Sequence, residues 1–133
     1  MTALRVEAEV APAGIGARVL VVEDDVLVRA LVSETLREAG CEVIEATTAD
    51  EAVAVLRAIV APDVLVTDVK LPGDLDGMQL AAKVRQTMPL TKVIVTSGHA
   101  SVEAAKSVAH VFLAKPFELW RLVGCVRTLA ARV

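Results

Sequence analysis

The chain has 133 residues, a length that fits one domain with a single hydrophobic core. Apolar residues make up 55% of it, enough to exclude wholesale disorder, and aromatic residues only 2%, so the core must be aliphatic. The formal net charge of −3, without any block rich in Lys or Arg, argues against direct binding of nucleic acid.

No stretch of the chain has the features of a signal peptide, and none approaches the ~18 consecutive apolar residues that a membrane span needs. Cys41 and Cys125 lie far apart and outside any CxxC spacing, so a zinc site is not expected. Their number alone permits a disulfide, but in a reducing cytosol both thiols are expected to stay free. We therefore expect a cytoplasmic protein without membrane contact.

The chain begins with residues 1–16, which are rich in Ala, Pro and Gly and predict a flexible N-terminal tail before one domain over residues 17–133. Within that domain, short β-branched apolar runs alternate with stretches of helical spacing. Strands are predicted at residues 18–22, 42–46, 63–67, 92–96 and 111–114. Helices are predicted at about residues 25–39, 48–59, 77–87, 101–108 and 118–130.

Several single residues carry a local structural prediction. Asp25 is expected to cap the first helix at its N-terminus, and Gly40 to follow its C-terminus. Thr48, with Glu51 three residues later, has the pattern of a capping box that opens the second helix. Trp120 on the last helix is expected to pack in the core, with an exposed contact to a partner as the alternative.

Five short hydrophobic strands alternating with five helices predict an α/β fold of the (βα)5 type, a doubly wound five-stranded parallel sheet covered on both faces. Ligands of such open sheets bind at the carboxyl ends of the strands. Charged side chains collect at three of these predicted ends, which are followed by Glu23, Asp24 and Asp25, by Asp68, and by Lys115.

Carboxylates about 4 Å apart repel by roughly 4 kcal/mol at an effective dielectric constant near 20, so such a cluster usually needs a cation. Oxygen donors on separate loops suit Mg²⁺, with Asp24 and Asp68 as direct ligands and Lys115 as a fixed positive charge opposite them. Acids after a strand are also common as helix caps, and a lone lysine is often only solvated. The convergence of acids, the Thr96 hydroxyl and a lysine at one sheet edge favours a functional site.

Four segments in this order, VVEDD, TDVKLPG with a later DG, VIVTSG and FLAKPF, resemble the receiver domain of bacterial two-component response regulators over about residues 17–131. The resemblance implies that Asp68 accepts a phosphoryl group from a histidine kinase or a histidine phosphotransfer protein. It also implies a Mg²⁺ ion held by Glu23, Asp24, Asp68 and the backbone carbonyl of Lys70.

The resemblance further implies a switch. Thr96 matches the switch hydroxyl, Lys115 the lysine that pairs with a phosphoryl oxygen, and Phe112 the aromatic residue that moves on activation. Mg²⁺, Lys115 and the Thr96 hydroxyl would meet the charge that develops on the transferring oxygens when Asp68 attacks phosphorus. The output would be altered contact with a downstream protein, and a homodimer through the fourth-helix to fifth-helix face is a further implied contact. The Lys115–Pro116 bond is often cis in the family.

The sequence departs from the family pattern in three places. The loop over residues 72–77 is one residue longer than the commonest form. Lys70 puts a basic side chain beside the acceptor, at a position that tunes the lifetime of the acyl phosphate. The segment over residues 98–110 is shorter than usual, so the fourth helix is expected to be short, shifted or mobile.

We expect a stand-alone receiver that acts by phosphorylation-dependent protein contact or in a phosphorelay, and not an enzyme with an external product. One alternative is the receiver module of a larger hybrid kinase or transcription factor. Another is a metal-dependent phosphatase with an aspartyl nucleophile, although its usual DxD pattern is not matched by the run from Glu23 to Asp25. A third is a receiver-like module used only for binding.

Overall fold

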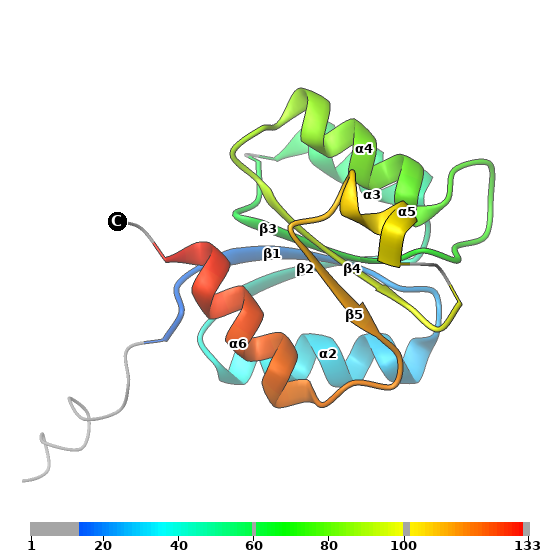
Figure 1. Cartoon of the computed structure of the whole chain (residues 1–133). Coiled ribbons are helices and arrows are strands. Elements are labelled where there is room, and N and C mark those ends of the chain that lie inside the picture. The colour runs from blue at the N-terminus through cyan, green and yellow to red at the C-terminus, as the bar shows by residue number, and fades with distance from the viewer. Residues whose placement is uncertain (1–13, 60, 100–101, 132–133) are drawn as a thin grey trace, which may run out of the picture.

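The computed structural model describes residues 14–59, 61–99 and 102–131 and contains a five-stranded parallel sheet in the order β2-β1-β3-β4-β5 (Figure 1). The strands are β1 (Arg18–Val22), β2 (Glu42–Ala46), β3 (Val64–Asp68), β4 (Lys92–Ser97) and β5 (Val111–Ala114). The helices are α2 (Val26–Glu38), α3 (Ala49–Ala58), α4 (Gly77–Thr87), α5 (Val102–Lys106) and α6 (Leu119–Ala130). The predicted fold class is confirmed.

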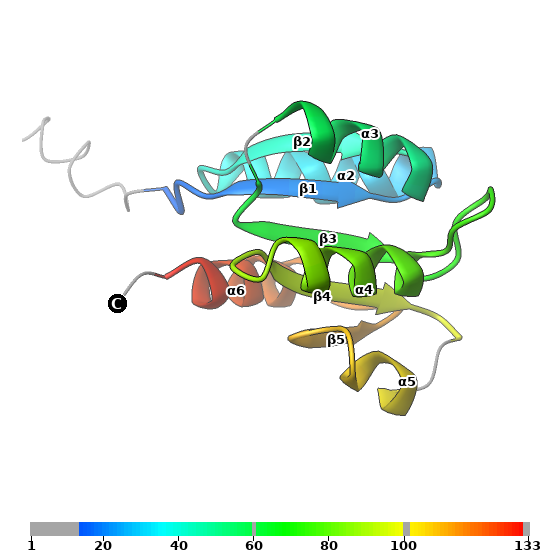
Figure 2. The ribbon, with the colours of Figure 1, turned by 90° about the horizontal axis from the view of Figure 1, so that it is seen from above.

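The helices form two layers, with α2 and α6 on one face of the sheet and α3, α4 and α5 on the other (Figures 1 and 2). Side chains of a strand alternate between these layers. Val19 and Val21 of β1 pack in the cluster under α2 and α6, whereas Leu20 and Val22 pack in the cluster under the other three helices. Both faces of β1 are thus buried, which explains its uninterrupted apolar sequence.

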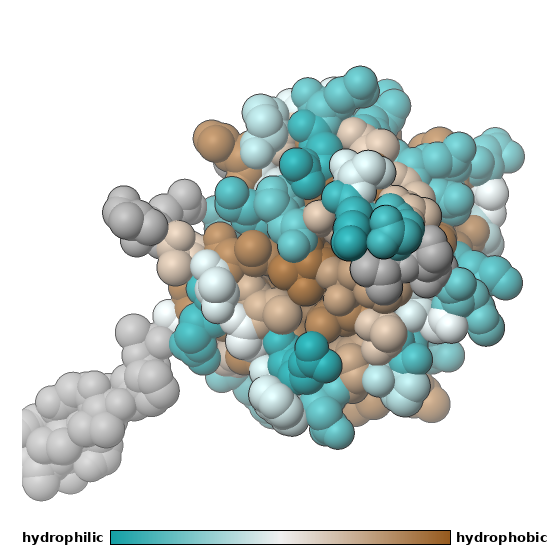
Figure 3. All heavy atoms as spheres, viewed as in Figure 1, coloured by the Kyte–Doolittle hydropathy of each residue, from teal (hydrophilic) through white to brown (hydrophobic). Residues whose placement is uncertain are grey.

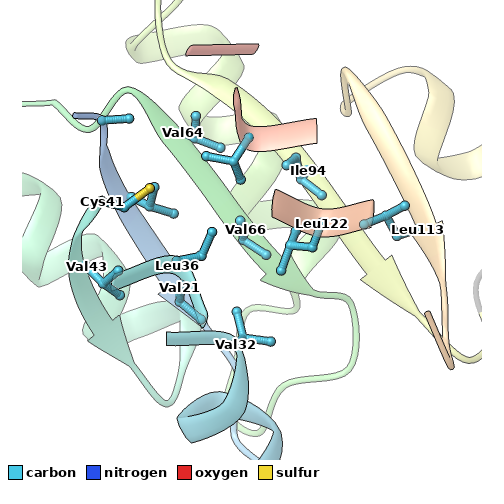
Figure 4. Packing of buried hydrophobic residues seen from close by; sticks show 13 residues of the cluster. Val21, Val32, Leu36, Cys41, Val43, Val64, Val66, Ile94, Leu113 and Leu122 are labelled. Atoms are coloured by element: carbon cyan, nitrogen blue, oxygen red, sulfur yellow. The ribbon is translucent and has the colours of Figure 1, made fainter. Parts of the chain in front are cut away.

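The cluster between the sheet and the pair α2 and α6 is aliphatic, as predicted (Figure 4). Val66 and Ile94 from the sheet meet Leu36 of α2 and Leu122 of α6. Cys41 is buried in the same cluster, and both cysteines are free thiols, as predicted.

The strand order also fixes where a site can form. The chain runs from β1 outward to β2 and then returns past β1 to β3, so the connections leave in opposite directions from the junction of β1 and β3. Such a reversal of strand order opens a crevice at the carboxyl ends of the two strands. The residues that follow β1 and those that end β3 therefore lie beside this crevice.

Most predicted boundaries are confirmed, with small corrections. The Asp25 side chain accepts hydrogen bonds from the backbone of Leu27 and Val28, both at 3.0 Å, and Gly40 has a φ of 91°. Thr48 caps α3, but Glu51 accepts the backbone N–H of Thr47 and not that of Thr48, so the predicted capping box is only half formed.

Several predicted segments differ in extent, among them β4, which ends at Ser97 and not at residue 96. Strand β3 ends at Asp68, one residue later than predicted, and α5 spans only five residues, so the expectation of a short fourth helix is confirmed. Residues 14–16 of the predicted tail lie against the end of α2, where Ile15 N–H donates to the Ala39 carbonyl at 2.8 Å. Residues 1–13, the rest of that tail, lie outside the described residues.

Trp120 does not pack in the core, so the preferred prediction for this residue is wrong. Its exposed fraction is 70%. The buried positions of α6 are Leu122 and Val126, one turn apart, and a residue two places before Leu122 lies on the opposite side of the helix. Across the described part of the chain, every helix is too short or too polar to cross a membrane.

His110 extends the pairing of β4 and β5 by one residue. The Val93 N–H donates to His110 Nδ1 at 2.9 Å, and the His110 N–H donates to the Val93 carbonyl at 2.8 Å. Burial of the ring, with smaller contributions from Arg85 and Lys92, lowers the pKa of His110. The neutral ring is the form that accepts the Val93 bond, so protonation removes it.

We expect stability to fall as the pH falls through the pKa of folded His110. The pKa of His110 in the folded protein is below the value of about 6.5 that it has in the unfolded chain, so the unfolded chain binds the proton first as the pH falls. His110 therefore contributes its full stabilisation only at a pH above the unfolded pKa. Urea unfolding at pH 7.5 and 5.5 should show a larger loss of stability for the wild type than for His110→Gln. Equal losses would contradict this assignment.

The two ends of α2 offer a matched test of the core. Leu36→Ala removes a fully buried side chain and should lower the free energy of unfolding by about 2–5 kcal/mol. Leu27→Ala removes a side chain that is 74% exposed and should change it by no more than about 0.5 kcal/mol. Urea denaturation of the two variants measures both values, and similar effects would contradict the described packing.

Candidate functional site

Three carboxylates meet at the crevice between β1 and β3. Glu23 and Asp24 follow β1, and Asp68 is the last residue of β3. One oxygen from each lies within 4.8 Å of the others, Glu23 and Asp68 being buried and Asp24 exposed. Carboxylate oxygens at this spacing can hold a metal ion, and they are the donors that Mg²⁺ prefers. The structure therefore brings together the three acids that the sequence singled out.

Lys115 lies among these acids rather than opposite them. Its Nζ is 2.8 Å from Oε1 of Glu23 and 3.1 Å from Oδ2 of Asp68. Burial disfavours the charged ammonium, but the two hydrogen-bonded carboxylates outweigh it and raise the pKa of Lys115. The lysine therefore stays protonated and offsets part of the repulsion between the acids.

Several contacts act on the pKa of Glu23 in opposite directions. Burial raises its pKa, whereas the bonds from Lys115 and from the Asp25 N–H lower it, and the nearby charge of Asp68 raises it again. The net effect is a raised pKa, so burial outweighs the ion pair. The charged carboxylate is thus held at a cost that a further positive charge would reduce.

Asp68 is held by the backbone on both sides. It pairs with Thr96 in the β3–β4 ladder, and its carbonyl accepts the Thr67 hydroxyl at 2.9 Å. The Gly77 N–H donates to the Val69 carbonyl at 2.8 Å, and a Cβ on Gly77 would lie only 1.7 Å from the Asp68 carbonyl oxygen. The sequence showed the DG pair of this loop but not that the start of α4 touches the backbone of Asp68.

Thr96 and Phe112 lie on the neighbouring strands. The Thr96 side chain is buried, and its hydroxyl donates a long hydrogen bond of 3.5 Å to the Thr67 carbonyl. Phe112 is half-buried against the cluster under α3, α4 and α5, one place along the β4–β5 ladder from the partner of Thr96. The two predicted switch residues are therefore near neighbours in the sheet.

A pocket of about 230 Å³ opens beside Asp68. Its lining combines positive charge with hydroxyl and backbone groups, from Asp68, Lys70, Ser97, Gly98, His99 and Lys115. His99, an exposed loop residue, is among the side chains that line this pocket. The Lys115–Pro116 bond next to the pocket is cis, as the resemblance implied.

Comparison with known protein families decides the relationship. Residues 19–127 match the response regulator receiver domain. The chain belongs to this family. The receiver is 34% identical over 114 residues to the DNA-binding transcriptional regulator NtrC of Escherichia coli K12, a match that covers 81% of the receiver and 24% of NtrC.

Two further relatives agree. The transcriptional regulatory protein PdtaR of Mycobacterium tuberculosis is 33% identical over 126 residues, which cover 92% of the receiver and 60% of PdtaR. The crystal structure of a CheY-like receiver domain protein from Methanospirillum hungatei matches with a TM-score of 0.79 at 28% identity, over 86% of the receiver and 94% of that chain. The receiver thus spans a quarter of NtrC and less than two thirds of PdtaR.

A methyl group on Gly77 tests the contact that holds Asp68. Gly77→Ala should lower the free energy of unfolding by about 1–3 kcal/mol, because the backbone around Asp68 must move to admit the methyl group. Gly124→Ala on α6, where no atom lies within 4 Å of the added Cβ, should instead stabilise by about 0.5–1 kcal/mol. Thermal denaturation compares the two variants. A Gly77→Ala protein as stable as the wild type would refute the close approach.

Proposed function

We propose that this receiver accepts a phosphoryl group on Asp68 in the presence of Mg²⁺ and that the modification changes its contacts with other proteins. The observation that carries the proposal is the Lys115 ammonium bonded to both Glu23 and Asp68 at the mouth of an open pocket. The ion would be held by the carboxylates of Glu23, Asp24 and Asp68 and by the Lys70 carbonyl. When bound, Mg²⁺ supplies positive charge to the transferring oxygens.

Each residue has a role in the transfer. An Asp68 oxygen attacks phosphorus and forms an acyl phosphate, while the bond from phosphorus to the donor's imidazole nitrogen breaks and the imidazole leaves. The Lys115 ammonium already donates a hydrogen bond to Asp68. It can therefore bond to the phosphoryl oxygens as negative charge passes to them from the carboxylate. Water then hydrolyses the acyl phosphate, which releases inorganic phosphate and restores the Asp68 carboxylate, so the receiver acts on its own modification and not on an external substrate.

The switch follows from the added charge. A phosphoryl group brings up to about two negative charges and strong acceptor oxygens. Within the described residues, the Thr96 hydroxyl makes a long bond of 3.5 Å to the Thr67 carbonyl, which a phosphoryl oxygen can replace. Movement of Thr96 frees space that Phe112 can enter, and this alters the face formed by α5, β5 and α6.

An apolar groove beside the site favours a protein as phosphodonor. It has a volume of about 760 Å³, lies between α2 and the start of α6, and shares Lys115 with the Asp68 pocket. Its other lining residues include Leu31 and Trp120, both exposed. A histidine kinase or phosphotransfer protein with an apolar helix could cover this groove while its histidine reaches Asp68.

The face of α5, β5 and α6 is the proposed contact for a downstream protein or a second copy. Apolar surface gathers in the middle of this face (Figure 3). A groove of about 380 Å³ runs between Val111 of β5 and Trp120, Cys125 and Leu129 of α6. Strand β5 is also the edge of the sheet, and an uncovered edge with apolar neighbours favours association.

Incubation with acetyl phosphate and Mg²⁺ tests the phosphoacceptor directly. Intact-protein mass spectrometry should show the gain of one phosphoryl group by the wild type and by Asp74→Asn, a control at an exposed acid of the neighbouring loop. Asp68→Asn should gain none. Because Trp120 lines the groove that shares Lys115, its fluorescence should change only in the proteins that are modified.

Two outcomes would contradict the proposal. Modification of Asp68→Asn to the same extent would place the phosphoryl group elsewhere. Steady hydrolysis of a generic phosphate ester by the wild type would favour the phosphatase alternative. The stand-alone role and the location in a reducing cytosol stay predictions. The mass of the native protein tests the first, and cell fractionation tests the second.

A further inference from the structure

Arg29 of α2 contacts the backbone of the acidic loop that follows β1. Its Nη1 donates to the backbone carbonyl of Glu23 at 2.9 Å, and its Nε donates to Oε1 of Glu45 on β2 at 3.2 Å. The side chain is only 17% exposed. No sequence pattern singles out this arginine, since it lies within a helix and away from the strand ends.

The carbonyl that Arg29 holds belongs to the peptide between Glu23 and Asp24. On the other side of Glu23, its N–H donates to the Ala46 carbonyl at 3.1 Å. With both neighbouring peptides held, the backbone that carries the Glu23 side chain is fixed, and the carboxylate itself accepts bonds from Lys115 and from the Asp25 N–H. Asp24 is exposed, so the orientation of the peptide before it decides where its carboxylate can point. A rotation of this peptide would therefore move both acids.

Arg29 is itself held in place. Oε2 of Glu45 accepts a hydrogen bond from Nη2 of Arg37 at 3.0 Å, and the same Nη2 donates to the Val43 carbonyl at 3.2 Å. The fork of donors on an arginine suits such a double contact, because one planar group reaches a carboxylate and a carbonyl at once. Glu45 thus fixes the rotamer of Arg29, and Arg29 fixes the acidic loop.

We propose that Arg29 is a positioning residue for the divalent-cation site and that Glu45 acts through it. The inference rests on the proposed function, in which Glu23 and Asp24 help to hold Mg²⁺. Arg29 touches the backbone of the loop and not its carboxylates, so it acts by orienting ligands. Outer contacts of this kind typically change metal affinity by 10–100-fold when removed.

A purely structural role is the competing explanation, since Arg29 also ties α2 to β2. Stability alone would not distinguish the two roles, whereas affinity for the metal does. Isothermal titration of the unphosphorylated protein with MgCl₂, without any phosphodonor, measures that affinity directly. Circular dichroism of each variant shows whether it is folded.

Arg29→Ala should weaken Mg²⁺ binding by roughly tenfold. Arg29→Lys keeps one donor for the carbonyl and should recover most of that loss. Glu45→Ala should weaken binding less than Arg29→Ala, and the double variant should bind like Arg29→Ala alone, because Glu45 acts only through the arginine. Arg18→Ala breaks another Arg–Glu pair with β2, the one to Glu42 at 3.2 Å, and should leave the affinity unchanged.

The outcomes separate the two proposals. Wild-type affinity in folded Arg29→Ala overturns the positioning role and leaves the proposed function intact. If Arg18→Ala weakens Mg²⁺ binding as much as Arg29→Ala does, the positioning role is also overturned. Any contact that ties an element to β2 would then support the affinity equally well. If Arg29→Ala does not fold, Glu45→Ala decides, and wild-type affinity in that variant overturns the role. A wild type that binds no Mg²⁺ rejects the metal-dependent function itself.

Discussion

The ammonium of Lys115, bonded to Glu23 and Asp68 at the end of the sheet, is the contact on which the site depends. Two carboxylates that are largely buried would repel each other and lose their hydration if nothing else were near. Lys115 offsets both costs without removing them, as the raised pKa of Glu23 shows. Three carboxylates meet the Lys115 ammonium at this place, so the cluster carries more negative charge than Lys115 neutralises, which is a suitable state for binding a cation.

The topology explains why these residues meet although they are distant in sequence. Lys115 lies 92 positions after Glu23 and 47 after Asp68. The reversal of strand order at β1 and β3 brings the first two acids beside Asp68, and the pairing of β4 and β5 brings Lys115 to the same edge. The central strands β1, β3 and β4 are buried on both faces, and this packing holds the backbone of the edge in place.

Sequence patterns predicted the parts of the structure that depend on local physics. Apolar runs located β1, β2 and β5 at the observed residues, and the cap at Asp25 followed from its place before a helical pattern. The acids and the lysine were found because polar residues directly after buried strands must gather at one edge. The assignment of Asp68 as phosphoacceptor came from the family resemblance and stays a prediction.

What the sequence missed depends on contacts between distant elements. The bond from Arg29 to the Glu23 carbonyl and the approach of Gly77 to Asp68 exist only once helices pack beside strands. His110 is exposed at the edge of β5, and its ring accepts a hydrogen bond from the backbone N–H of Val93 that no sequence pattern indicates. Trp120 was expected in the core because of its size, but helix phase places it outside.

A crystal of the unphosphorylated receiver soaked in MnCl₂ would test the central claim most directly, because the anomalous signal of manganese locates a divalent ion without assumptions. We predict one strong peak coordinated by oxygens of Asp24 and Asp68, with Glu23 in contact directly or through water. A soaked crystal with no peak at these carboxylates, and with Lys115 still as their sole counter-charge, would contradict it.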